Sequence, residues 1–184
     1  KHGDHVEARV HPTMILNSNP LSHIDQSMNA IAIDADATGK TMLYGHGAGM
    51  MPTASAVLSD IADIARNIIS NTKRRVPILG YPEDNIKPIP ILPISELETR
   101  YYLRFTVQDH PGVLARISGV LGRQNISINS VNQKGRNEQG TVPVVMITHT
   151  AREEDVQNAL SEIAAFDFCL STPVIIRIED NNGE

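Results

Sequence analysis

Several features are scarce or missing in this sequence of 184 residues, and each absence narrows what the protein can be. A single cysteine, Cys169, excludes an intramolecular disulfide framework and fits a reducing compartment. No run of 18 uninterrupted apolar residues occurs, so the sequence predicts no membrane-spanning helix, and the first residues lack the apolar core of a signal peptide. The net charge of −5 and the single basic run, Lys73–Arg75, argue against nucleic acid as a partner. The cytoplasm is therefore the expected compartment, with neither membrane nor nucleic acid as a partner.

The composition, with 41% apolar and 20% charged residues, indicates a globular chain that forms one large domain or two small ones. Val6, Ala8 and Val10 alternate with polar residues, which predicts a strand over residues 5–11 that ends at Pro12. Because this pattern begins so close to residue 1, and the first residue is not methionine, we expect the chain to be the C-terminal part of a longer protein.

Residues 1–75 are predicted to form a first unit. Two strands near 28–34 and 40–45 are joined by a loop that contains glycine, which is typical of a hairpin. A glycine-rich turn over 45–49 then leads into a helix that starts near Thr53. The apolar positions of this helix follow the i, i+3, i+4, i+7 pattern: Ala54, Val57, Leu58, Ile61, Ala62, Ala65, Ile68 and Ile69.

Residues 76–99 contain five prolines within 17 positions and are predicted to be a semi-rigid linker. Residues 100–179 follow the order β-α-β-β-α-β, which predicts a ferredoxin-like unit and an α+β fold class. Pro111 should open the first helix, and Thr150 with Glu153 should form a capping box for the second. The buried faces should be Val113, Leu114, Ile117, Val120 and Leu121 on the first helix, and Val156, Ala159, Leu160, Ile163 and Ala164 on the second.

Few residue patterns in the chain point to chemistry. The segment Gly45-His46-Gly47-Ala48-Gly49 lies between a strand and a helix N-terminus, where backbone N–H groups favour an anion. Met50 stands where a dinucleotide fingerprint would continue, so a simple tight turn is the stronger interpretation from the residues alone. His5, Glu7 and His11 share a strand face, but about 20 Å separates the histidines at about 3.3 Å per residue, so no metal site is predicted.

The segment 109–114, with the sequence Asp-His-Pro-Gly-Val-Leu, is the second candidate. It places a carboxylate and a glycine at a strand-to-helix junction, where Asp109 or His110 can cap the helix. The exposed N–H groups there can hold a small carboxylate. A capped helix without any ligand explains the same residues equally well. We find no complete set of catalytic side chains, and Cys169 is interpreted as a small buried hydrophobic residue.

The second half of the chain resembles an ACT domain. The resemblance lies in a strand followed by Asp109, Pro111, Gly112, Val113 and Leu114, and in Ile126-Ser127-Ile128 at the next strand. ACT domains bind amino acids as allosteric effectors, usually as side-by-side pairs. The resemblance implies that Asp109, Pro111 and Gly112 contact the effector.

The first half resembles the C-terminal end of homoserine dehydrogenases, an enzyme family in which an ACT domain often follows. This resemblance is carried by the segment 6–13, Val-Glu-Ala-Arg-Val-His-Pro-Thr, and by the segment 44–57, Tyr-Gly-His-Gly-Ala-Gly-Met-Met-Pro-Thr-Ala-Ser-Ala-Val. Together the two resemblances cover nearly the whole chain. They imply the end of an α/β catalytic domain over 1–75, the linker over 76–99 and an ACT domain over 100–179.

The resemblance implies reduction of aspartate 4-semialdehyde to homoserine with NADPH or NADH, on the route to threonine, methionine and isoleucine. Gly49 would contact the nicotinamide cofactor, and the helix from Thr53 would pack on a nucleotide-binding domain. The family's nucleotide fingerprint, catalytic lysine and substrate-binding acids would all lie upstream of Lys1, so no catalytic residue is assigned in this chain. Threonine is the implied effector, and a homodimer or homotetramer the implied assembly. The alternative is an amino-acid-binding ACT module that performs no chemistry.

Overall fold

The computed structural model describes residues 4–72, 81, 83–133, 135 and 140–179. Contacts between residues divide the chain into two compact units, one of residues 1–16 with 89–184 and one of residues 17–88. These units differ from the predicted domains, because residues 1–16 group with the C-terminal unit. The predictions for Lys73–Arg75, for part of the linker and for most of the turn at 135–140 lie outside the described residues.

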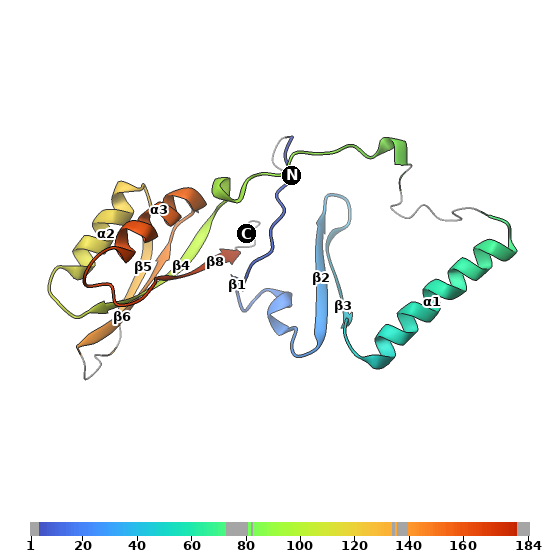
Figure 1. Ribbon diagram of the computed structural model, residues 1–184, viewed down its shortest axis with the longest axis horizontal. Coiled ribbons are helices and arrows are strands. Elements are labelled where there is room, and N and C mark those ends of the chain that lie inside the picture. The colour runs from blue at the N-terminus through green and yellow to red at the C-terminus, as the bar shows by residue number, and fades with distance from the viewer. Residues whose placement is uncertain (1–3, 73–80, 82, 134, 136–139, 180–184) are drawn as a thin grey trace. The chain divides into compact units, whose positions relative to one another are not determined.

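The C-terminal unit contains the predicted ferredoxin-like arrangement, with two helices on one face of an antiparallel sheet (Figure 1). The helices are α2 (Val113–Arg123) and α3 (Glu153–Ala164). The strands are β4 (Glu98–Gln108), β5 (Ile128–Gln133), β6 (Thr141–Thr148) and β8 (Val174–Glu179). Their order across the sheet is β8-β4-β6-β5. The predicted fold class is therefore confirmed for this unit.

The hydrophobic core of this unit lies between the sheet and the two helices. Alternate residues of β4 and β6 point into it because successive side chains on a strand face opposite ways. The core side chains include Tyr101, Leu103, Phe105, Val107, Val142, Val144, Met146, Ile117, Val120, Leu121, Val156, Ala159, Leu160 and Ile163. Each large apolar side chain buried in this way contributes about 1.5–3 kcal/mol. Leu114 was predicted to belong to this face, but it is 40% exposed at the first turn of α2.

The N-terminal segment differs from its prediction. Val6 makes a single bridge to Ile91, the other residues of 7–11 pair with no strand in the described chain, and Val10 is fully exposed. The strand β1 (Thr13–Ile15) follows Pro12 and pairs in parallel with β8. The predicted strand over 5–11 was therefore wrong. An alternating pattern shows which residues can form a strand, but it does not show where the neighbouring strand lies. That neighbour, β8, lies more than 160 residues further along the chain and pairs with residues 13–15.

Four short elements complete the described chain. Three are 3₁₀ helices: η1 (Pro20–His23), η2 (Glu83–Asn85) and η3 (Ile94–Glu96). The last is β7 (Ala151–Arg152), which pairs with the start of β4.

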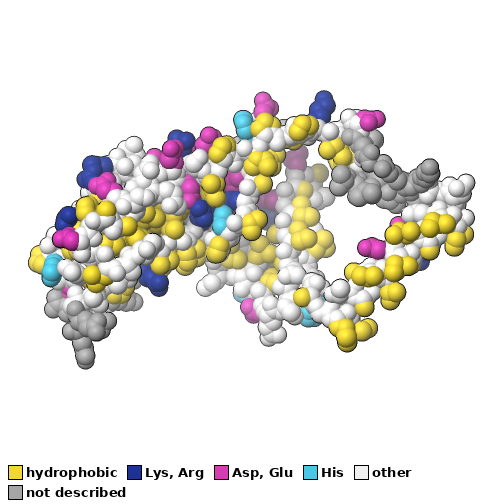
Figure 2. Space-filling model, viewed as in Figure 1, with side chains coloured by type: hydrophobic (Ala, Val, Ile, Leu, Met, Phe, Trp, Pro, Cys, Tyr) yellow, Lys and Arg dark blue, Asp and Glu magenta, His cyan; other side chains and the backbone are white. Residues whose placement is uncertain are grey.

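The unit of residues 17–88 contains the predicted hairpin and helix. Strands β2 (Met28–Ala35) and β3 (Gly39–His46) pair in antiparallel register, with Asn29 opposite Gly45. Helix α1 (Met50–Ile69) begins three residues before the expected Thr53. Apolar side chains follow one another along α1 (Figure 2), and none of its residues is buried within the described chain. Its exposed large side chains are Met50, Met51, Val57, Leu58, Ile61, Ile64, Ile68 and Ile69.

Candidate functional site

The first candidate site is the glycine turn, residues 45–49, between β3 and α1. Gly49 is the N-cap of α1, with φ +122° and ψ 153°, a backbone conformation that residues other than glycine rarely adopt. Its carbonyl accepts the first bond of the helix from the Thr53 N–H, at 3.1 Å. Glycine is therefore required at position 49 by conformation, a reason that the spacing of the three glycines did not reveal.

The start of α1 exposes backbone donors next to this turn. Helix geometry leaves the N–H groups of Met50 and Met51 without a partner inside the helix, and Pro52 has no N–H to offer. No acidic side chain lies in the first turn, so the positive end of the helix dipole is not neutralised there. A small anionic group fits the backbone of the turn, because Gly49 has no side chain to block its approach.

The second candidate site is the α2 cavity, a hollow of about 330 Å³ at the junction of β4 and α2. All three residues predicted to bind an effector line it: Asp109, Pro111 and Gly112. The other lining residues are Val107, Gln108, His110, Val113, Leu114, Gln133, Val142 and Val144. Gln133 comes from β5 and the valines 142 and 144 from β6, so the cavity joins segments that the sequence could not connect.

The start of α2 differs from its prediction. Neither Asp109 nor His110 caps the helix, because the N-cap is Gly112, whose φ of 91° places it in the left-handed region. The helix consequently begins at Val113, two residues after Pro111. The backbone before it is held by the Asp109 N–H, which donates to the Gly140 carbonyl at 2.9 Å. Helix geometry leaves the N–H of Leu114, a cavity-lining residue, without a partner inside α2.

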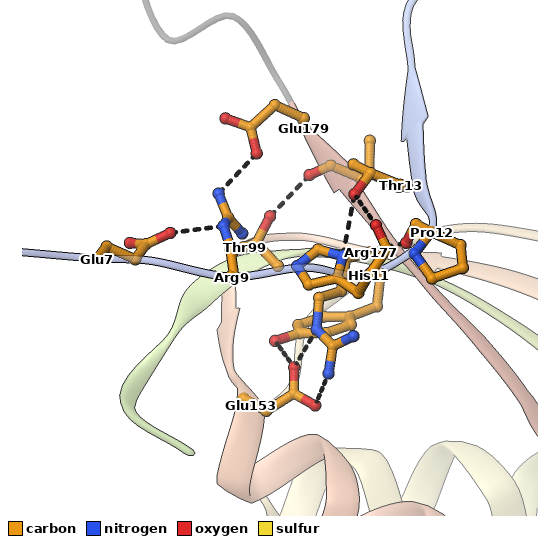
Figure 3. Close-up of polar contacts among 11 residues, drawn as sticks. Glu7, Arg9, His11, Pro12, Thr13, Thr99, Glu153, Arg177 and Glu179 are labelled. Atoms are coloured by element: carbon orange, nitrogen blue, oxygen red, sulfur yellow. Dashed lines mark hydrogen bonds and ion pairs between the residues drawn. The ribbon is translucent and has the colours of Figure 1, made fainter. Parts of the chain in front are cut away.

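Sequence reasoning missed a buried polar cluster at the start of α3 (Figure 3). Glu153, with only 3% of its surface exposed, accepts hydrogen bonds from the Tyr101 hydroxyl at 2.9 Å and from Arg177 Nε at 2.7 Å. Gln157 also donates to it, at 2.8 Å. The predicted capping box is therefore wrong: the N-cap is Arg152, and the Glu153 side chain faces the sheet. The sequence did contain a signal for the burial of Glu153: it lies three residues before Val156, and residues at this spacing share one face of a helix.

The ionisation of this cluster follows from its contacts. Burial disfavours the charged form of Glu153, but hydrogen bonds from Arg177, Gln157 and Tyr101 outweigh it, so the pKa of Glu153 is lowered. Burial, together with the hydrogen bond to this carboxylate, raises the pKa of Tyr101 far above its usual value. The cluster links β4, β8 and α3, because Tyr101, Arg177 and Glu153 belong to these three elements.

A second polar group ties the N-terminal segment to β8 (Figure 3). Arg9 forms ion pairs with Glu7 and with Glu179, both at 2.7 Å. The Val6 N–H donates to the Pro90 carbonyl, and the Val6 carbonyl accepts from the Leu92 N–H, both at 2.9 Å. Val6 and Arg9 therefore connect the segment before β1 to residues of the C-terminal unit.

Two further properties concern the described part of the chain only. No group of three or more His, Cys, Asp or Glu side chains lies close enough together there to hold a metal ion, and His5 and His11 belong to no such group. No helix in that part has the length and apolar character needed to cross a bilayer. Cys169 packs at the edge of the core, and its thiol donates to the Ser171 carbonyl at 3.3 Å.

Comparison with known proteins gives a match for each half of the chain. The family model for homoserine dehydrogenase matches residues 1–62, and that for the ACT domain matches residues 101–168. Homoserine dehydrogenase from Neisseria gonorrhoeae is 42% identical over 97% of this chain, and that from Pseudomonas aeruginosa is 41% identical over 96%. The crystal structure of a homoserine dehydrogenase from Thiobacillus denitrificans is similar with a TM-score of 0.82 and 38% identity over 96% of this chain.

The chain is shorter than these relatives. It spans 41% of the Neisseria and Pseudomonas proteins and 40% of the Thiobacillus chain. The similarity therefore covers both halves of this chain and about two-fifths of each relative.

Proposed function

We propose that the whole protein is a homoserine dehydrogenase and that this chain supplies the end of its catalytic part together with an ACT regulatory domain. The reaction is the reduction of aspartate 4-semialdehyde to homoserine with NADPH or NADH, in the biosynthesis of threonine, methionine and isoleucine. The observation that carries this proposal is identity of 41–42% to homoserine dehydrogenases over both halves of the chain. A biosynthetic enzyme of this kind is expected in the cytoplasm.

In this proposal the glycine turn holds part of the nicotinamide cofactor. The cofactor supplies the hydride, and this chain supplies backbone donors for an anionic or polar group at the start of α1. Gly49 contributes through the close approach of its backbone. The exposed apolar face of α1 supports a contact between this helix and another part of the whole protein, because a helix with such an apolar stripe normally packs against another element. We assign that role to the nucleotide-binding domain.

The α2 cavity is proposed to bind the amino-acid effector, with threonine as the first candidate. Its volume of about 330 Å³ lies within the range of small-ligand pockets. The effector carboxylate would accept hydrogen bonds from N–H groups at the start of α2, and its ammonium group would pair with Asp109. Pro111 and Gly112 shape the turn that brings these groups together.

The edges of the sheet support pairing of the ACT domain with a second copy. Strand β1 covers the free side of β8, whereas β5 has a strand neighbour on one side only in the described chain. An open edge strand presents unpaired backbone groups that favour pairing with another strand. Gln133 belongs both to β5 and to the cavity lining, so a partner on this edge would lie next to a bound effector. We therefore propose a homodimer through β5, or a homotetramer if the catalytic parts also associate.

The test uses the whole protein. Purified enzyme should oxidise NADPH only when aspartate 4-semialdehyde is present, and threonine should inhibit that rate. Absence of turnover with either NADPH or NADH refutes the assignment. Threonine binding in calorimetry without any turnover would instead identify a regulatory binding module.

A further inference from the structure

One side chain outside the glycine turn lies against the middle of it. Asn29, on β2, lies opposite Gly45 of β3 in the hairpin register. A Cβ atom placed on Gly47 would lie 1.6 Å from Asn29 Nδ2 and 2.9 Å from Asn29 Cγ. The carboxamide of Asn29 therefore occupies the space that any side chain at position 47 would need.

The three glycines of the turn have different surroundings. Gly49 is required by its φ of +122°, and a Cβ on Gly45 would meet nothing within 4 Å. Gly47 has no positive φ, so the contact with Asn29 is what distinguishes it. The atom met is the end of an exposed side chain, so an alanine at position 47 would displace the carboxamide of Asn29 from its place against the turn. Among the glycines of the described chain, only Gly47 would bring a Cβ within 3.0 Å of another atom.

The Asn29 carboxamide is also available to a ligand. The side chain is exposed, and no described residue forms a hydrogen bond with its amide group. A primary amide offers two donors and one acceptor without adding a charge next to an anionic cofactor. Its packing on Gly47 places it two residues before the N-cap of α1.

We propose that Asn29 is a positioning residue for the nicotinamide cofactor: its carboxamide, packed on Gly47, holds the turn in the shape in which Gly49 and the start of α1 meet the cofactor. This inference rests on the proposed function. It assigns no step of the reaction to Asn29, which acts through the backbone of the turn. Small displacements of such a backbone are costly to binding because its donors are effective only at hydrogen-bond distance.

A double-mutant cycle in the whole protein tests the proposal. Asn29→Ala removes the carboxamide, and Gly47→Ala forces it out of the same place, since the new methyl group and the amide cannot share that space. Each variant should raise the KM for NADPH about tenfold, the size expected for one lost positioning interaction, and change the KM for the semialdehyde much less. The double variant should resemble each single variant, because both substitutions remove the same contact.

Asp34→Ala is the matched control, since Asp34 is an exposed residue further along β2 and away from the turn. It should leave the KM for NADPH unchanged. The Kd for NADPH, measured without the semialdehyde, should follow the KM in every variant, and thermal unfolding should show that all variants are folded. An unchanged KM in Asn29→Ala overturns the proposal, and so does a double variant about a hundredfold weaker, the product of two independent effects.

The unsubstituted protein separates this inference from the proposed function. If it binds no NADPH and turns over no semialdehyde, the proposed function fails, and the positioning role fails with it. If it does both and the Asn29 and Gly47 variants match it, only the positioning role fails.

Discussion

The ion pair between Arg177 and Glu153 offers a sharp test of what holds the C-terminal unit together. Only 4% of the Glu153 side chain and 16% of the Arg177 side chain are exposed. Arg177→Met keeps an unbranched apolar stem and removes the guanidinium group. Glu153 then keeps its hydrogen bonds from Tyr101 and Gln157, but its buried charge loses its ionic partner.

The expected loss of stability is large. Removing one partner of a buried pair costs about 3–5 kcal/mol, because the remaining charge is left without compensation. A domain has only about 5–15 kcal/mol of net stability, so this is a substantial share. Adding Glu153→Gln to Arg177→Met should restore most of the loss, because a neutral amide can still accept the Tyr101 hydroxyl without a buried charge.

The pH dependence of the stability of this unit gives a second, independent test of the role of Glu153. In the natural protein the folded-state pKa of Glu153 is lowered, so its contribution is present above the unfolded value of about 4.3 and is lost as pH falls through the folded pKa. Arg177→Met removes the Arg177 hydrogen bonds and positive charge that help to lower this pKa, so we expect the pKa of Glu153 in the variant to rise. Protonation then relieves the buried charge, and the destabilisation should shrink as the pH falls from 7 toward 4.

The measurement is hydrogen exchange by mass spectrometry in increasing urea, on peptides from β4 and α3, which report the opening of this unit. Arg123→Met is the control, because Arg123 pairs with Glu162 at the surface, with 61% and 41% of the two side chains exposed. An exposed pair contributes less than about 1 kcal/mol. A loss below about 1 kcal/mol for Arg177→Met at pH 7, or a loss independent of pH, would refute the reasoning.

Four further outcomes are expected. This chain alone should not oxidise NADPH with aspartate 4-semialdehyde, because its glycine turn supplies only part of a cofactor site; semialdehyde-dependent oxidation in an absorbance assay would contradict this. Gly49→Val in the whole protein should raise the KM for NADPH strongly with the fold retained, since valine at φ +122° costs about 1–3 kcal/mol and crowds the turn; an unchanged KM removes Gly49 from the site. Asp109→Ala should abolish any threonine binding that calorimetry detects in the unsubstituted protein, and retained affinity would exclude Asp109. Gly112→Ala should destabilise the start of α2 by about 1–2 kcal/mol because the φ of Gly112 is 91°; urea unfolding measures this against Gly122→Ala in the last turn of α2, where a Cβ would meet nothing within 4 Å.

Local patterns were sufficient for the elements whose partners lie nearby in the chain. The hairpin over 28–46 was predicted because both strands and their loop fall within twenty residues. The ferredoxin-like order followed from period-2 and period-3.6 alternation, which reports which side of an element meets the core. The same alternation predicted most of the buried faces of α2 and α3, but it wrongly included Leu114 and Ala164, which are exposed. The residues of both candidate sites were singled out because glycine and proline at strand-to-helix junctions constrain the backbone strongly.

Only the tertiary structure decided the features that depend on distant segments. The partner of β1 is β8, and the Glu153 side chain contacts Tyr101 and Arg177 where a capping role was predicted. The side chain that occupies the space next to Gly47 comes from Asn29 on another strand. The lining of the α2 cavity likewise joins the segment after β4 to side chains of β5 and β6. Sequence periodicity is set by the local geometry of one element, whereas these contacts are set by the packing of elements against one another, where a side chain's neighbours are unrelated to its position along the chain.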